Sequence, residues 1–95
     1  MKQLFHQYMA WQAQNWDEPN MARSLLKFHE EVGELNAALY RADRPAFKDA
    51  LADVVISLLG VAVAGGVNLP AEVEAVWREV GSRNYRLYPK NGRDQ

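Results

Sequence analysis

The stretch LLKFHEEVGELNAAL, residues 25–39, sets the pattern from which the rest of the chain can be interpreted. Its apolar residues recur in steps of three and four, which is the period of one face of an α-helix. These residues are Leu25, Phe28, Val32, Leu35 and Leu39. The spacing predicts a helix over about residues 21–42 that packs this face against the rest of the fold.

The same stretch places carboxylates beside the apolar face. At 100° per residue, Glu31 and Glu34 lie along one edge of that face, and Glu30 lies further round. Asp53 is the only charged residue within residues 50–71. Burying a lone carboxylate costs several kcal/mol or shifts its pKa until it is neutral. A cation shared by these acids would remove that cost, and Mg²⁺ is the natural candidate because it prefers oxygen ligands and usually binds together with phosphate.

Four helices and no strands are predicted for the chain. The expected spans are residues 2–15, 21–42, 46–64 and about 70–81 or 84. Asn20 suits the N-cap of the second helix, Pro45 the first turn of the third, and Gly65 the end of that helix. The short connections predict an all-α, four-helix up-and-down bundle in which the second, third and fourth helices are antiparallel neighbours. This order would place residues 30–34 beside residues 49–53.

Oligomerisation is expected from the composition of the third helix. It is apolar almost all round, so we expect it to be central or to lie against a second subunit. The 95 residues make one small domain, 1–95, and the polar residues 88–95 are expected to form a mobile tail. A homodimer or homotetramer that buries its apolar helices is therefore predicted.

Composition excludes several classes of site and partner. The chain has no cysteine, which excludes disulfides, thiolate metal sites and cysteine nucleophiles. No apolar stretch reaches the roughly 20 residues of a membrane span, and residues 1–7 lack the apolar core of a signal peptide. We therefore expect a cytoplasmic protein without a membrane partner. The net charge of −1 disfavours stable binding of nucleic acid.

Positive charge nevertheless gathers at the C-terminal end. Residues 78–95 hold five Lys/Arg against two Asp/Glu, whereas residues 1–77 hold six against ten. Two interpretations are open. The basic end is either a solvated surface or a clamp for a polyphosphate, for which the planar fork of arginine is well suited.

Four blocks of the sequence, in order, resemble the MazG-like all-α nucleoside triphosphate pyrophosphohydrolases over roughly residues 20–90. They are EEVGEL at 30–35, DALADV at 49–54, GGVNL at 65–69 and NYRLYP at 84–89. The family pattern is E-E-x-x-E, followed by E-x-x-D on the next helix. The last block is similar to the dCTP pyrophosphatase-type branch of the family.

The resemblance implies a housekeeping enzyme of the nucleotide pool. Its reaction would be Mg²⁺-dependent attack of water on the α-phosphorus of a (d)NTP, which gives a (d)NMP and pyrophosphate. By position, Glu31, Glu34 and Asp53 match the family's metal ligands, and Mn²⁺ can replace Mg²⁺. Glu30 matches the acid that positions or deprotonates the water, which is a general-base role.

The chain departs from the family pattern in the second acidic block. The glutamate of E-x-x-D falls at Ala50, which cannot bind a metal. Asp49, one residue earlier and four before Asp53, is the candidate to compensate from the same helix face. If it does not, one metal site is weakened.

The C-terminal block also departs from the pattern. The family's lysine falls at Val80, and the basic residue before the tyrosine-proline pair falls at Leu87. Arg83 and Arg86 are the expected substitutes for phosphate contact. Asn84 and Tyr88 match the family's substrate-binding positions directly.

Two tryptophans invite different interpretations. Family members stack the base on aromatic side chains near the acidic helix, and base stacking is worth ~1–3 kcal/mol in single-strand binders. Trp16, beside the turn after the first predicted helix, is expected to bind substrate in this way, although it could instead anchor the loop. Trp77 is expected to pack on the apolar face of the fourth helix.

Two alternatives stay open. The first is a phosphoribosyl-ATP pyrophosphohydrolase, which has a similar size and similar acidic helices, although the closing block from Asn84 to Pro89 argues against it. The second is a non-catalytic helical oligomerisation module whose active site has decayed. Ala50, which replaces the family's glutamate, would be the remaining sign of that loss. Such a module would show no turnover and no stabilisation by metal.

Overall fold

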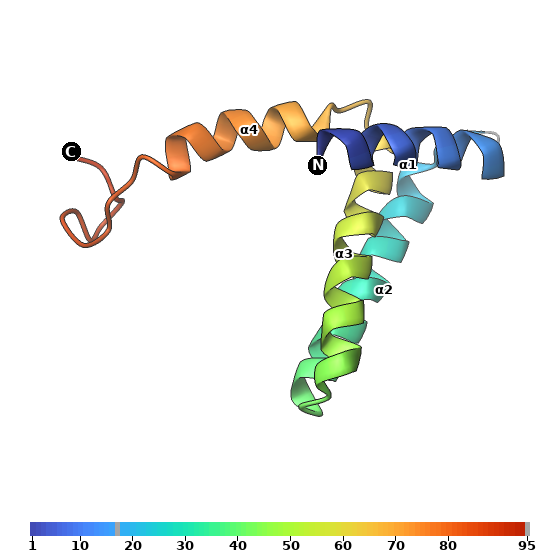
Figure 1. The fold of residues 1–95 in the computed structure, drawn as a ribbon, viewed down its shortest axis with the longest axis horizontal. Helices are drawn as coiled ribbons and strands as arrows, with labels where there is room; N and C mark the ends of the chain where they lie inside the picture. Colours follow the sequence, from blue (N-terminus) through green and yellow to red (C-terminus); the bar gives the residue numbers. More distant parts are fainter. Residues whose placement is uncertain (17, 95) are drawn as a thin grey trace.

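Four α-helices make up most of the computed structural model, which describes residues 1–16 and 18–94. They are α1 (Lys2–Asn15), α2 (Met21–Tyr40), α3 (Arg44–Ala64) and α4 (Leu69–Val80). No strand occurs in these two ranges. The predicted all-α class and the number of helices are confirmed (Figure 1).

Short polar caps decide where the helices begin. The side chains of Asn20, Asp43 and Asn68 each accept a hydrogen bond from the backbone N–H three residues later. Such caps satisfy donors that a helix start otherwise leaves unpaired. The cap at Asp43 starts α3 two residues earlier than predicted. At the end of α2, Ala42 adopts a left-handed φ of 56°, so this helix ends before the predicted residue.

Helices α2 and α3 form an antiparallel pair joined by a short turn (Figure 1). Ala38 and Ala50, one from each helix, are only 1% and 5% exposed. Small side chains at such positions allow two helices to approach closely. The predicted adjacency of the acidic segments on these two helices is therefore correct.

Helix α1 crosses the upper end of this pair, where the small apolar core lies. Phe5 of α1 packs with Leu59 and Ala62 of α3. Gly60 leaves room for the Tyr8 side chain of α1, because a Cβ atom at this position would stand 2.7 Å from the Tyr8 hydroxyl oxygen. The core thus fixes α1 across α3 near one end of the hairpin.

Helix α4 does not pack beside α3. The two helices bend by 109° at the intervening turn, so α4 projects sideways as an arm, and the expected antiparallel packing of α3 with α4 is wrong (Figure 1). No α4 residue is buried, and Trp77, which was expected to pack, is 64% exposed. The turn uses Gly66 at a φ of 67°, which favours glycine. Its direction leaves Val73, Val76 and Trp77 of α4 exposed.

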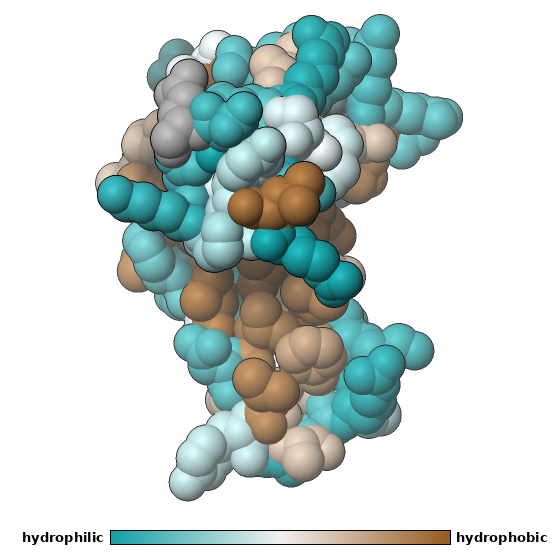
Figure 2. Space-filling view, turned by 90° about the vertical axis from the view of Figure 1, so that its left-hand side faces the viewer, coloured by the Kyte–Doolittle hydropathy of each residue, from teal (hydrophilic) through white to brown (hydrophobic). Residues whose placement is uncertain are grey.

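Much of α3 is also uncovered. Leu51, Ile56 and Leu58 are all more than a third exposed. Figure 2 shows apolar side chains gathered below the projecting arm, in the angle between the arm and the hairpin. In the described part of the chain no single helix is long and apolar enough to cross a membrane, and only the bent pair α3 and α4 together reaches that length and composition.

Candidate functional site

The antiparallel pairing of α2 and α3 brings three carboxylates together. Glu31 and Glu34 come from α2 and Asp53 from α3, and one oxygen of each lies within 4.8 Å of the others. Glu31 is buried, Asp53 is half-buried and Glu34 is exposed. The group is therefore open to solvent on one side, as a site that binds a substrate must be.

The two oxygens of Glu31 have different surroundings. Oε1 accepts an ion-paired hydrogen bond from Lys27 Nζ at 2.8 Å. Oε2 is buried and has no hydrogen-bond partner among the described residues. An unpaired buried carboxylate oxygen is costly, because it has lost water without gaining another donor. A cation beside Oε2 would supply the missing partner.

The geometry of the group suits a small divalent cation. Oxygen ligands around Mg²⁺ stand about 2.1 Å from the ion, so two of them are roughly 3–4 Å apart. The oxygens of Glu31, Glu34 and Asp53 already lie within 4.8 Å of one another, and small side-chain rotations would close the difference. These three carboxylates, the predicted ligands, fit a hard metal ion.

The electrostatics of the group agree with this fit. The Glu31 carboxylate raises the pKa of Glu34 by repulsion, and desolvation and Asp53 act in the same direction. The pKa of Lys27 is raised by its hydrogen bond to Glu31 and by the negative charge of the Glu31 carboxylate. Negative charge is thus concentrated here, and one lysine partly balances it.

Two further predicted site acids lie outside this group. Glu30 and Asp49 are both exposed, and neither shares the 4.8 Å cluster. Ala50, which stands where the family has a glutamate, is 5% exposed between the helices. The structure therefore assembles three of the five predicted acids and leaves the other two at its surface.

A cavity of about 310 Å³ opens between α1, α2 and α3 beside the acidic group. Aromatic and charged side chains line it together with neutral polar and apolar ones. The aromatic side chains are Tyr8, Trp11 and Trp16, the basic ones are Arg23 and Lys27, and the acidic ones are Glu18, Glu31 and Asp53.

The aromatic wall includes the predicted substrate residue Trp16. Its ring meets that of Trp11 edge to face, with centroids 5.1 Å apart, and Tyr8 lies 5.6 Å from Trp11. Trp16 follows directly after α1 and is 45% exposed, so part of its ring is free for a flat ligand. The structure brings Trp16 and the acidic group to the same cavity.

The basic side chains that line the cavity, Arg23 and Lys27, were not predicted from the sequence. Arg23, Lys27 and Glu31 are spaced by four, which puts them on one face of α2. That spacing is visible in the sequence, whereas its position beside a cavity depends on how α1 and α3 pack against α2. Tyr8, which also lines the cavity, was not among the predicted site residues.

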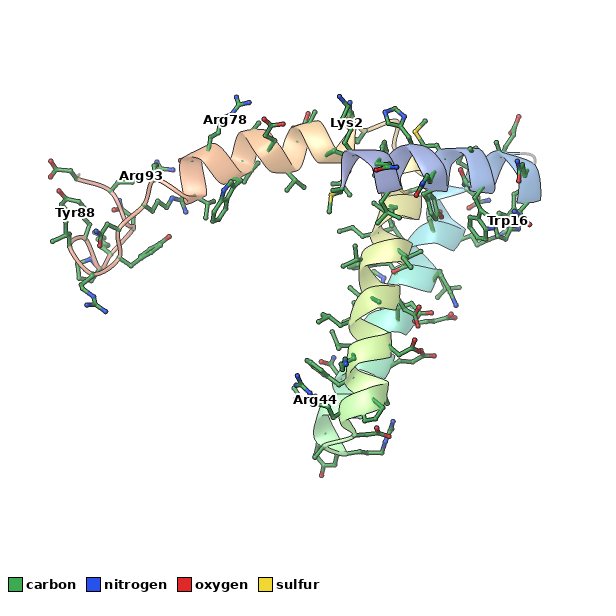
Figure 3. All side chains as sticks on the ribbon, in the orientation of Figure 1. Lys2, Trp16, Arg44, Arg78, Tyr88 and Arg93 are labelled. Carbon is green, nitrogen blue, oxygen red and sulfur yellow. The ribbon has the colours of Figure 1, made fainter. Side chains whose placement is uncertain are left out.

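The predicted C-terminal substrate residues lie elsewhere. Tyr88 stands beyond the end of α4, at the opposite side of the molecule from Trp16 (Figure 3). Asn84 organises this region, since its Oδ1 accepts from the backbone N–H groups of Arg86 and Leu87. Its own N–H donates to the carbonyl of Gly92 and closes a loop. Within one chain, these residues are not part of the cavity.

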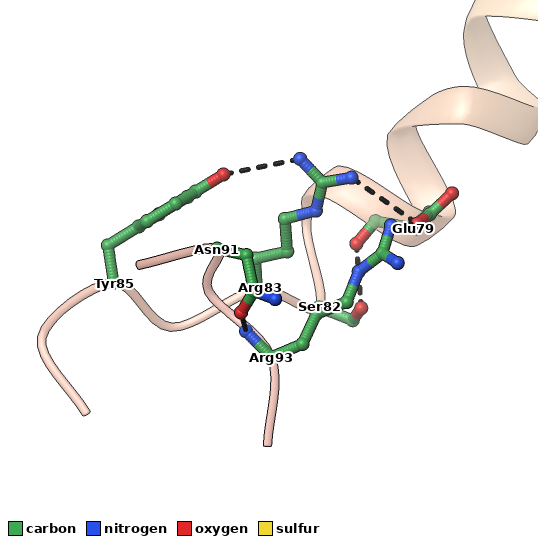
Figure 4. A network of polar contacts seen from close by, with 6 residues as sticks. All are labelled: Glu79, Ser82, Arg83, Tyr85, Asn91 and Arg93. Atoms are coloured by element: carbon green, nitrogen blue, oxygen red, sulfur yellow. Dashed lines mark hydrogen bonds and ion pairs between the residues drawn. The ribbon is translucent and has the colours of Figure 1, made fainter. Parts of the chain in front are cut away.

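Arg83 takes part in a local network at the base of this loop (Figure 4). Its guanidinium donates to Glu79 Oε1 at 3.3 Å and to the Tyr85 hydroxyl at 3.2 Å. Arg93 also pairs with Glu79. Arg86, in contrast, has no ion pair with any residue in 1–16 or 18–94. Of the two predicted arginines, Arg86 is the one whose charge is free.

Comparison with known proteins gives one match. A family model described as phosphoribosyl-ATP pyrophosphohydrolase matches residues 1–84. No curated protein and no solved structure matches the chain significantly. The matched range includes all four helices, and with them the acidic group and the cavity. Because the match covers most of the chain, this protein belongs to the phosphoribosyl-ATP pyrophosphohydrolase family and is a pyrophosphohydrolase of all-α fold.

Proposed function

We propose that the chain hydrolyses the bond between the α- and β-phosphates of a nucleoside triphosphate, (d)NTP, and releases pyrophosphate. The observation that carries this proposal is the group of Glu31, Glu34 and Asp53 beside a cavity with an aromatic wall. Such a site offers a metal centre for the phosphates and a stacking surface for the base. A role in nucleotide-pool housekeeping follows from the reaction.

Each part of the site has a proposed role. Held by the three carboxylates, Mg²⁺, or Mn²⁺ in its place, would neutralise phosphate charge and lower the pKa of a bound water. In the reaction, the water oxygen bonds to the α-phosphorus, the bond from this phosphorus to the bridging oxygen breaks, and pyrophosphate leaves. Glu30, next to Glu31 on α2, accepts the proton that the water loses. Trp16 stacks on the base.

Asp49 is proposed as a further metal ligand. It lies one turn before Asp53 on α3 and is exposed, so it is free to turn towards a second ion beside the first. Ala50 cannot take this role. A second ion held by Asp49 would supply further positive charge for the phosphates.

A second candidate substrate is phosphoribosyl-ATP, which the family match favours. This compound also carries a triphosphate, so the same carboxylates would serve the same bond. The two candidates differ at the base, where phosphoribosyl-ATP is larger. The dCTP pyrophosphatase-type assignment rests on the closing block from Asn84 to Pro89, which lies beyond the matched residues except for Asn84 itself.

We further propose that the enzyme is a homodimer or homotetramer. No α4 side chain is buried, and large apolar residues of α3 and α4 are exposed together. Tyr88 and Arg86 lie beyond the end of α4 in a molecule 49 Å long, so they would reach the acidic group of a second copy rather than their own. The basic loop and the acidic cluster have opposite charge, which favours this docking.

The test is pyrophosphate release from a panel of NTPs, dNTPs and phosphoribosyl-ATP, with Mg²⁺, with Mn²⁺ and with chelator. Release that chelator abolishes is expected from one or a few members of the panel. Glu72→Gln, an exposed acid on α4, is the matched control for substitutions in the cluster. A folded protein that releases pyrophosphate from none of them would instead be the oligomerisation module with a decayed site.

A further inference from the structure

Lys27 is the basic side chain nearest the acidic cluster in the cavity. Its Nζ lies 2.8 Å from Glu31 Oε1, and the lysine side chain is 63% exposed whereas that of Glu31 is 7% exposed. An ammonium group has three N–H donors, and the bond to Glu31 uses one of them. The other two are available to a ligand in the cavity that Lys27 and Glu31 both line.

The ion pair is not explained by helix stability alone. In helices, a pair with Glu four residues before Lys is the better orientation, and Lys27 and Glu31 have the reverse order. Lys27 also engages only Oε1, while Oε2 stays buried without a partner. The lysine thus orients the carboxylate and leaves the second oxygen free for a metal ion.

A polyphosphate in this cavity needs cations besides the metal. Three carboxylates surround the metal position and carry three negative charges when all are ionised. A divalent ion bound there therefore leaves no net positive charge to attract the phosphates. The arginines of the C-terminal loop, Arg83, Arg86 and Arg93, do not line this cavity. Among the described residues that line the cavity, the cations are Arg23 and Lys27, one turn apart on α2.

We propose that Lys27 binds the phosphates of the substrate in this site while it holds Glu31 in place for the metal. Arg23, one turn earlier on α2, is the second cation that binds the phosphates. The proposal rests on the proposed function, because it names the side chains that contact the phosphates. Lys27 is a substrate-binding and positioning residue.

The experiment measures binding and not turnover. Inorganic tripolyphosphate is titrated into protein at saturating Mg²⁺ by calorimetry, and Mg²⁺ alone is titrated separately. The variants are Lys27→Met, which keeps the apolar stem and removes the charge, and Lys27→Arg, which keeps the charge. Lys48→Met, the same change at an exposed lysine of α3 outside the cavity lining, is the matched control.

Lys27→Met should weaken tripolyphosphate binding roughly 10- to 100-fold, the value of a lost hydrogen bond to a charged group. Binding of Mg²⁺ alone should be unchanged or tighter, because a competing cation is removed from Glu31. Lys27→Arg should keep most of the tripolyphosphate affinity, and Lys48→Met all of it. Lys27→Gln repeats the test with a polar side chain should the methionine variant lose helicity.

Three results would overturn the proposal. The first is wild-type protein that does not bind tripolyphosphate, and the second is Lys27→Met that binds it unchanged. The third is an equal loss of Mg²⁺ and tripolyphosphate affinity, which would make Lys27 only a support for Glu31. If tripolyphosphate binding depends on Lys27 while no nucleotide is cleaved, the proposed function fails and the phosphate-binding role stands.

Discussion

The α2–α3 hairpin and the α4 arm with its C-terminal loop are held in place in different ways. The hairpin buries Ala38, Ala50 and the Glu31 carboxylate between its own helices. The arm buries no residue of α4, and its loop is closed by local hydrogen bonds such as that from Asn84 N–H to the Gly92 carbonyl. The acidic cluster is therefore assembled within one chain, whereas the predicted substrate residues of the C-terminal loop lie outside the cavity.

Because of this difference, substitutions in the hairpin and in the arm should affect the enzyme in different ways. Changes in the hairpin should act on metal binding and chemistry directly, in any oligomeric state. Changes in the arm should act through the proposed assembly, in which a second copy would cover Val73, Val76 and Trp77, all of them exposed here. The following predictions test this separation, from the largest expected effect to the smallest.

Asp53→Asn should abolish turnover while leaving the helical fold intact. The amide removes one of three ligand charges, and since loss of a supporting residue already costs 10–100-fold in typical metal sites, loss of a ligand should cost roughly 100-fold or more. Pyrophosphate release and far-ultraviolet circular dichroism measure the two properties. Glu72→Gln serves as control, and unchanged turnover in Asp53→Asn would refute the ligand role.

Trp77→Ala should dissociate the proposed oligomer without unfolding the hairpin. Trp77 is 64% exposed on a helix that has no buried residue, and aromatic anchors at interfaces are commonly worth about 2 kcal/mol or more. Light scattering after size exclusion gives the mass. Arg78→Ala, next in the sequence and ion-paired only with Glu74 of the same helix, is the control. A mass equal to wild type would mean that α4 is not the interface.

Ala50→Glu should destabilise the fold and strengthen Mg²⁺ binding. Ala50 is 5% exposed between α2 and α3, and overpacking such a position costs roughly 1–3 kcal/mol. The new carboxylate restores the acid of the family pattern. Urea unfolding and Mg²⁺ titration measure the two effects, with exposed Ala52→Glu as control. Unchanged Mg²⁺ affinity would mean that Asp49 or another group already fills the site.

Arg86→Ala should raise KM more than it alters kcat. Arg86 has no ion pair among the described residues, and loss of one charged hydrogen bond to phosphate costs roughly tenfold in affinity. Steady-state kinetics would show the split, with Arg44→Ala at the far end of the hairpin as control (Figure 3). A fall in kcat at constant KM would argue against a ground-state phosphate contact.

Tyr8 should report the cavity through a small effect at high pH. Burial raises the pKa of its phenol above the ordinary value of 10.0. The folded state therefore holds the proton more tightly than the unfolded state, so this stabilisation is complete below pH 10 and is lost as the pH rises through the folded pKa. Absorbance near 295 nm should show one late-titrating tyrosine, which Tyr8→Phe removes. A titration curve unchanged by this substitution would contradict the burial of Tyr8.

Local features of the sequence were enough to predict the helices. Asn20 and Pro45 mark helix starts by capping and by fixed φ, and these effects act over three or four residues. The spacing of Glu31 and Glu34 and the short connection before α3 were enough to predict that Asp53 would face them. This much of the site follows from helix geometry alone.

The sequence by itself therefore determined the four helices, the acidic pair on α2 and its meeting with Asp53. Only the tertiary structure decided the direction of α4, the aromatic wall that α1 adds to the cavity, and the burial of the Glu31 carboxylate. The physical reason is the distance along the chain over which each interaction acts. Caps and periodicity act within a turn or two, whereas the placement of an apolar helix depends on which surface covers it, and the sequence does not state whether that surface belongs to its own chain or to another.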